Sequence, residues 1–264
     1  MPSPTPAFSS PEAFEANSGG AATVRATGTA NAFSAPSANI SFERELDFKV
    51  GNGLFKKLWV SSPSSTLASD GLGPLFNARS CQRCHLKDGR GHPPEGPDDS
   101  RVSMLVRLSI PAETGGPEEI AGYLATLPEP TYGTQLQDLG IAGMPVEGSF
   151  DVAYEEIRVD LSDGETAYLR RPTYALTGLA YGEMHPDTMA SPRVAQQMIG
   201  LGLLDAIPAA DILANADPDD LDGDGISGRP NIVMSQEVGV PMLGRFGHKA
   251  GQPSLHEQTA AAFS

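Results

Sequence analysis

Residues 81–85 read Cys81-Gln82-Arg83-Cys84-His85 and contain both cysteines of the chain and one of its five histidines. The order Cys-x-x-Cys-His is typical of a covalent attachment site for c-type haem. On the first turns of a helix, Cys81, Cys84 and His85 stand at i, i+3 and i+4 and project from one face. The two thiols can then bond the haem vinyl groups while His85 binds the iron as proximal ligand. The motif therefore predicts a haem site.

Two other sites use a Cys-x-x-Cys pair, namely a redox disulfide and half of a zinc site. A zinc site needs two more thiolates or well-spaced histidines, and the chain has no further cysteine. A thioredoxin-like disulfide is expected within a βαβ unit, which the flanking sequence does not supply. We therefore predict covalent haem c. We also expect a backbone carbonyl of the Gly/Pro-rich stretch 88–97 to accept the Nδ1 proton of His85.

Charge and hydropathy restrict the partners and the location. Eighteen Lys and Arg residues against 33 Asp and Glu residues give a net charge of −15, which repels nucleic acid and anionic membranes and favours a basic protein or a small neutral or cationic substrate. No run of about eighteen apolar residues is present to span a membrane. Because bacteria attach haem c outside the cytoplasm, we expect a periplasmic or secreted protein. Residues 1–6 do not resemble a signal peptide, so we expect a removed leader or a piece of a longer chain.

The pattern divides the 264 residues into four regions. Residues 1–38, rich in Pro, Ser, Ala, Gly and Thr, are expected to form a flexible arm. Residues 39–101 form the haem-binding region, in which an apolar helical stripe from 40 to 60, broken near Gly51 and containing Trp59, is assigned to the core. Residues 102–181 carry alternating apolar patterns typical of an antiparallel β insert, with a hairpin turn at 162–165.

The last region, residues 182–264, is predicted to be helical. Ser191-Pro192 reads as a helix start, with an N-cap followed by proline at the first helical position. The last helical pattern, residues 255–263, has no stop signal, so we expect the chain to be truncated there. We predict an α+β protein, namely a mainly helical, cytochrome-c-like haem domain with an antiparallel β insert. Glycine (29) and proline (23) are abundant, which indicates many loops.

An acidic loop occupies residues 217–228. Its candidate ligands follow positions 1, 3, 5 and 7 of a D-x-D-x-D-G calcium loop and are Asp220, Asp222, Asp224 and the carbonyl of Ile226. Position 12 is Asn231 where calcium loops have a bidentate glutamate, so calcium would bind weakly or need a ligand from another segment. A solvated Asp-Gly turn is the alternative, and the sequence leaves both open.

Residues 71–94, which include the haem motif, resemble the bacterial di-haem oxidoreductase family of c-type cytochromes, also labelled putative peroxidase or thiol oxidoreductase. Residues 191–204, 222–231 and 244–250 resemble it too, so the resemblance runs from about residue 30 to the end. It implies a redox protein that relays electrons through one haem and acts on peroxide or a similar oxidant at another. Family members carry a second Cys-x-x-Cys-His toward the C-terminus, which this chain lacks, so we expect the N-terminal portion of such an enzyme.

The sixth iron ligand would decide the chemistry. Methionine or histidine there gives a low-spin haem that transfers electrons with a redox partner protein, whereas an open position lets a peroxide-like oxidant bind and be split. The favoured candidates are Met184 and His185, in the stretch 181–186, and His248, which stands where tryptophan is common in the family. The remaining candidates are Met104, Met144 and His256.

Two alternatives to a peroxidase-type enzyme stay open. The first is a simple electron-transfer cytochrome without catalysis of its own. The second is a calcium-stabilised secreted binding module in which Cys81 and Cys84 form a disulfide. The spin state of the haem separates the enzyme from the carrier, and retention of haem after denaturation excludes the binding module.

Overall fold

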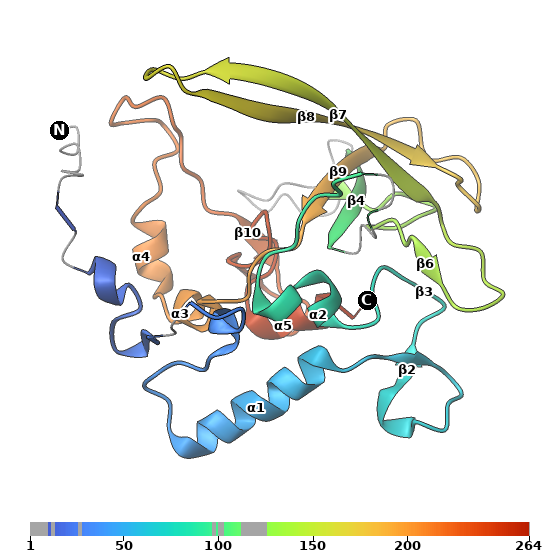
Figure 1. The fold of residues 1–264 in the computed structure, drawn as a ribbon, viewed down its shortest axis with the longest axis horizontal. Helices are drawn as coiled ribbons and strands as arrows, with labels where there is room; N and C mark the ends of the chain where they lie inside the picture. The colour runs from blue at the N-terminus through green and yellow to red at the C-terminus, as the bar shows by residue number, and fades with distance from the viewer. Residues whose placement is uncertain are drawn as a thin grey trace.

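The structure is a computed structural model, and the residues that it describes are 10–11, 14–25, 28–96, 99, 103–111 and 126–263. Residues 1–9 of the predicted arm and 112–125 of the predicted β insert lie outside the described residues. Figure 1 shows short helices and paired strands joined by long loops. Within the described part of the chain, no helix is long and apolar enough to cross a membrane.

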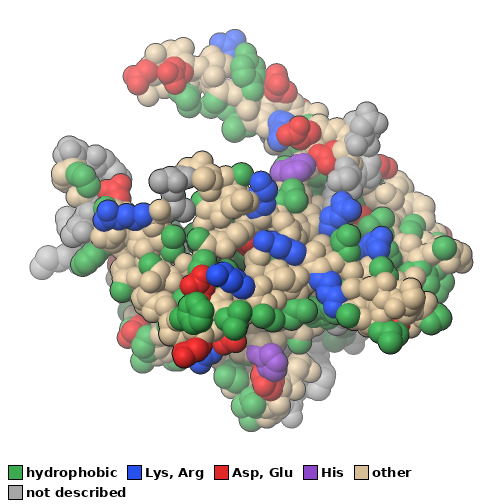
Figure 2. Space-filling model, turned by 60° about the horizontal axis from the view of Figure 1, so that its bottom comes forward, with side chains coloured by type: hydrophobic (Ala, Val, Ile, Leu, Met, Phe, Trp, Pro, Cys, Tyr) green, Lys and Arg blue, Asp and Glu red, His purple; other side chains and the backbone are tan. Residues whose placement is uncertain are grey.

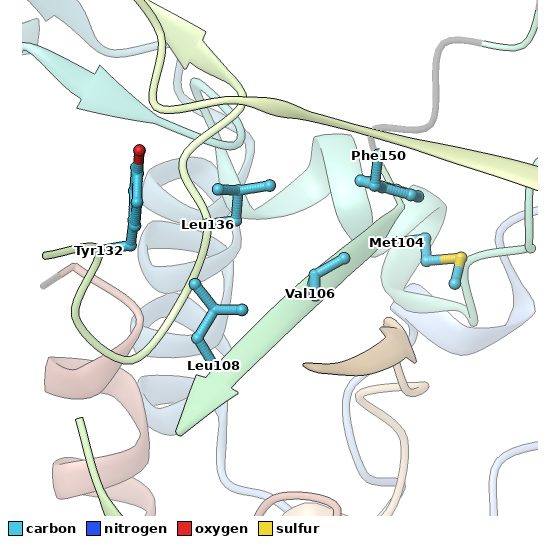
Figure 3. Close-up of a cluster of buried hydrophobic side chains, with 6 residues drawn as sticks. All are labelled: Met104, Val106, Leu108, Tyr132, Leu136 and Phe150. Carbon is cyan, nitrogen blue, oxygen red and sulfur yellow. The ribbon is translucent and has the colours of Figure 1, made fainter. Parts of the chain in front are cut away.

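The central strand is β4 (Met104–Pro111), in which apolar residues alternate with partly exposed ones. It lies between β5 (Thr126–Leu127) and β9 (Met189–Val194) in a three-stranded antiparallel sheet. Because side chains alternate along a strand, β4 presents one apolar row to a single face. This row meets three side chains from other segments, and the resulting buried cluster, drawn in Figure 3, consists of Met104, Val106, Leu108, Tyr132, Leu136 and Phe150.

The longest strands, β7 (Ser149–Asp160) and β8 (Thr166–Thr177), form one antiparallel hairpin that pairs along its whole length. Its turn contains Gly164 at a φ of 77°, a left-handed conformation that suits glycine. The hairpin predicted at 162–165 is therefore confirmed. In Figure 1 its outer end extends away from the rest of the chain. Its base reaches the core cluster through Phe150, with Val152 and Leu176 packed against that cluster.

The other strands form two-residue or three-residue pairs. β1 (Val60–Ser61) and β2 (Asp70–Leu72) are parallel, whereas the remaining pairs are antiparallel. These remaining strands are β3 (Leu75–Phe76) with β6 (Leu139–Gly140), and β10 (Ile232–Met234) with β11 (Pro241–Leu243). Such short pairs fix loops in place more than they build a core.

The helices are mostly single turns. The long helix α1 (Phe42–Lys56) has 15 residues. The others have four to seven residues and are α2 (Cys81–Cys84), α3 (Leu201–Asp205), α4 (Ala209–Leu213) and α5 (Leu255–Ala261). Five 3-10 turns complete the described helical structure: η1 (Glu15–Asn17), η2 (Gly20–Ala22), η3 (Ala32–Ser34), η4 (Leu67–Ser69) and η5 (Leu86–Asp88).

The prediction of a mainly helical protein is wrong. In the described residues, strands hold more of the chain than α-helices do, and most of them pair antiparallel. The strand β9 occupies the position where Ser191-Pro192 had indicated a helix start. Its residues pair with β4 from Met104 opposite Val194 to Ser109 opposite Met189. This pairing buries apolar residues of β4, and that tertiary gain exceeds a local helix-capping preference.

The apolar stripe assigned to the core is also different in the structure. The helix α1 runs through Gly51 without a break. Ser41 is its N-cap residue, and the Ser41 hydroxyl accepts a hydrogen bond from the backbone N–H of Arg44. Four residues spaced by i+4, Phe42, Leu46, Val50 and Leu54, are 55% to 85% exposed. Figure 2 faces the side on which α1 lies and shows hydrophobic side chains gathered across it, beside Lys and Arg side chains.

Candidate haem site

The haem motif forms one helical turn, as predicted. The backbone N–H of His85 donates to the carbonyl of Cys81 at 3.0 Å, so His85 closes the turn that starts with Cys81. The chain then bends through η5, where Lys87 and Asp88 have left-handed φ values of 53° and 63°. Cys81, Cys84 and His85 thus stand at helical spacing on a turn that ends directly after them.

The orientation of His85 is fixed by a residue far away in the sequence. Its Nδ1 lies 2.5 Å from the carbonyl oxygen of Gln196, which follows β9. Since a carbonyl only accepts, Nδ1 carries the proton and Nε2 keeps its lone pair, which is the form that binds a metal. Burial lowers the pKa of His85, against opposing effects of Gln196 and Asp88, which favours the neutral imidazole. The acceptor was expected in the stretch 88–97, and Gln196 takes its place.

The two thiols are partly exposed and are not joined in a disulfide. Burial raises the pKa of Cys81, and burial together with Asp138 and Cys81 raises the pKa of Cys84 to about 11. Redox-active thiols and zinc ligands are stabilised as thiolates by a lowered pKa. The surroundings of this pair act in the opposite direction and do not favour a redox-active thiolate.

Aromatic side chains from distant segments lie close to the motif. The ring of Phe55, at the end of α1, is 6.1 Å from the His85 ring. Trp59 donates its backbone N–H to the carbonyl of Arg79 at 2.8 Å, two residues before Cys81. Its indole packs edge-on against Phe263 at 5.9 Å. The Nζ of Lys57 also lies 4.9 Å over the Trp59 ring. Phe55 is therefore the aromatic side chain with a ring contact to the motif.

Asp88 connects the motif to three other segments, and sequence reasoning missed it. Its side chain is buried, at 8% exposure, and accepts hydrogen bonds from Ser34 Oγ and, at 3.3 Å, from Asn52 Nδ2 of α1. Its carbonyl accepts the N–H of Met198 at 2.8 Å. The Gly/Pro-rich stretch 88–97 indicated only a loop, because the partners of Asp88 are too distant in the sequence to be inferred from it.

The structure distributes the predicted distal ligands over several places. Met184 packs against the core cluster. The backbone N–H of His185 donates to Glu129 Oε1 at 2.8 Å, and His248 Nε2 lies 3.0 Å from the carbonyl oxygen of Val194. Among the described residues, no hydrogen bond or ring contact joins any of these side chains to His85, and the distal ligand stays a prediction. The other candidates are Met104 in the core, Met144 at the surface and His256 beside Glu237.

The acidic loop is closed by paired backbone hydrogen bonds between Asp217 and Gly228, at 2.8 and 2.9 Å. Carboxylate oxygens of Asp217, Asp220 and Asp222 lie within 4.8 Å of one another. Asp224 is not part of this group and accepts instead from the backbone N–H of Ile226 at 2.8 Å. The structure therefore brings Asp220 and Asp222 together, as predicted, and adds Asp217, which lies before the calcium-loop pattern.

The sequence of this chain matches one family model over nearly its whole length. The model is described as "Di-haem oxidoreductase, putative peroxidase" and covers residues 13–264. The chain belongs to the di-haem oxidoreductase family. Membership of this family indicates a redox role that involves haem. No curated protein and no solved structure matches it.

Proposed function

We propose that the protein is a c-type haem oxidoreductase of the peroxidase type, with thioether bonds at Cys81 and Cys84 and His85 as proximal iron ligand. The main support is the hydrogen bond between His85 Nδ1 and the Gln196 carbonyl, which leaves Nε2 for the metal. The ring of Phe55, 6.1 Å from the ring of His85, adds to it. The residues present therefore fit a covalently attached haem.

When bound, the haem would supply one-electron transfer and peroxide chemistry. The chain's own residues would hold and tune it. Gln196 would fix the ring plane of His85 and raise the basicity of its free nitrogen through the hydrogen bond. Phe55, beside His85, would exclude water from the motif, and exclusion of water changes the reduction potential of a haem.

This proposal includes a periplasmic or secreted location, because bacterial haem c is attached outside the cytoplasm. It also includes a redox partner protein as electron donor and a small peroxide-like oxidant. A simple electron-transfer cytochrome is the second candidate. The carrier is favoured if methionine or histidine is the sixth iron ligand. Met184, His185 or His248 would reach the iron only after the contacts described above rearrange.

The proposal is tested by the absorption spectrum of protein produced in a periplasm with haem-maturation machinery. We expect a Soret band, a sharp α-band after reduction with dithionite, and high-spin bands in the oxidised form that change when peroxide is added. A purely low-spin spectrum that ignores peroxide would favour the electron carrier. A colourless protein with a bare polypeptide mass would remove the haem assignment and leave the binding module with a Cys81–Cys84 disulfide.

The acidic loop allows a separate test of calcium binding. If the loop binds calcium, calorimetry with calcium chloride should show binding that is lost in Asp217→Asn and Asp222→Asn, because each removes a carboxylate from the group of three. Asp224→Asn should have a smaller effect, since Asp224 lies outside that group. Absence of heat at millimolar calcium would identify the loop as a solvated Asp-Gly turn.

A further inference from the structure

A cavity of about 360 Å³ is lined in part by Gln196, the residue whose carbonyl oxygen meets His85 of the haem motif. Its walls come from three segments that are distant in the sequence. The stretch after the motif contributes Arg90, the end of β9 contributes Arg193, and the loop after β11 contributes His248. The cavity therefore forms only when these three segments fold together.

The charged groups that line this cavity are cationic. Of the described residues, no Asp or Glu lines it, although the chain as a whole has a net charge of −15. Arg90 donates to the amide oxygen of Gln197 at 3.4 Å, and Arg193 donates to Ser191 Oγ at 3.3 Å. Within the described part of the chain, neither guanidinium has a carboxylate partner in an ion pair. Both therefore keep donors available to an anion.

The burial of Arg193 supports this description. Its side chain is half-buried, and the carbonyl oxygen of the next residue, Val194, lies 3.0 Å from His248 Nε2. Burial lowers the pKa of Arg193, in keeping with a partly desolvated charge. A partly desolvated arginine binds an anion more strongly than a fully hydrated one.

We propose that this cavity binds a carboxylate or phosphate group between the guanidinium groups of Arg90 and Arg193, with His248 forming part of the wall. Guanidinium groups bind both kinds of oxyanion through paired hydrogen bonds. The group has two chemical sources, namely a small free anion or a propionate of a haem attached to Cys81 and Cys84. The first source is independent of the proposed function, whereas the second rests on it.

The test is calorimetric titration of the haem-loaded protein and of haem-free protein with inorganic phosphate, in an amine buffer at low ionic strength. We expect Arg193→Gln and Arg90→Gln each to weaken binding about tenfold or more, since each removes charge-assisted hydrogen bonds to the anion. Arg158→Gln is the matched control. It removes the same charge from the β7–β8 hairpin, where Arg158 pairs with Asp160 at 2.8 Å.

The outcomes separate the two sources. Phosphate binding to both forms supports a site for a free anion, and binding to the haem-free form alone supports occupation by a haem propionate. No binding to either form overturns the proposal, and so does an equal loss in Arg158→Gln, which would show nonspecific attraction. Arg90 is exposed, so Arg90→Gln should fold normally. It therefore tests the site even if Arg193→Gln does not fold. If the protein never acquires haem, the titration of the bare polypeptide still decides on the anion site.

Discussion

Replacing Cys81 and Cys84 together by serine is expected to abolish covalent haem attachment completely. The hydroxyl group of serine does not form the thioether bond, and these are the two cysteines of the chain. Intact mass spectrometry should show the mass of one haem added to the unchanged protein and none added to the double variant. Haem staining after denaturing electrophoresis should give the same contrast.

The single variants Cys81→Ser and Cys84→Ser are the matched controls for this experiment. Each keeps one thiol on the same helical turn, so each should retain some covalent haem and stain more weakly than the unchanged protein. Haem that stays bound to the double variant after denaturation would contradict the assignment of both thioether bonds. Equal polypeptide yields for all variants are needed, so that lost staining reports attachment and not expression.

The haem motif could be predicted because its geometry is local. Spacing at i, i+3 and i+4 fixes a common face for three side chains once one helical turn forms. The residue that orients His85 could not be predicted in the same way. Gln196 is 111 positions away from His85, and it contributes a backbone carbonyl, which every residue type has. Only the path of the chain after β9 decides which carbonyl meets the imidazole.

The fold was predicted less well because local signals competed with strand pairing. Ser191-Pro192 carries a helix-start signal, but both residues belong to β9, where Pro192 lies opposite Val106. Proline is tolerated there because β9 is an edge strand of its sheet. The alternating pattern of β4 was correctly read as a strand. What the sequence could not show was that β4 needs a partner from beyond residue 188.

The stripe of α1 illustrates a second limit. Period 3.6 shows that Phe42, Leu46, Val50 and Leu54 share one side of a helix. It does not show whether that side is covered, and in the structure it is exposed. The neighbouring side, with Asn52 and Phe55, contacts the haem motif instead. A polar residue, Asn52, therefore marks the inner side of α1 through its hydrogen bond to Asp88.

Glu129→Ala is expected to lower the free energy of unfolding at pH 7 by about 3–5 kcal/mol. The Glu129 side chain is 1% exposed. Its carboxylate accepts the backbone N–H groups of Thr131 and Tyr132 at 2.6 Å and of His185 at 2.8 Å. Alanine would leave three backbone donors without this acceptor, one of them buried and two partly buried. Urea unfolding followed by circular dichroism measures the loss.

The same carboxylate predicts a dependence of stability on pH. Burial alone would raise the pKa of Glu129, but the hydrogen bonds from His185, Tyr132 and Thr131 outweigh it and lower the pKa below its usual value. A lowered folded-state pKa contributes stability that is present above the unfolded pKa of about 4.3 and is lost as the pH falls through the folded pKa. Unfolding free energies measured from pH 6 to pH 3 should therefore fall less steeply in Glu129→Gln than in the unchanged protein.

Glu156→Gln is the control for both Glu129 experiments, because Glu156 is exposed on β7. It should change stability by less than about 0.5 kcal/mol at pH 7 and leave the acid limb of the curve unchanged. Glu129→Gln itself should lose about 2 kcal/mol at pH 7, since an amide offers one acceptor oxygen and opposes the remaining donors with its own NH₂. Equal effects of the two Gln variants would show that the buried carboxylate does not hold the His185 segment against the core. Met184 packs in that same segment, so a loss of stability here would also loosen the side chain predicted as a distal ligand.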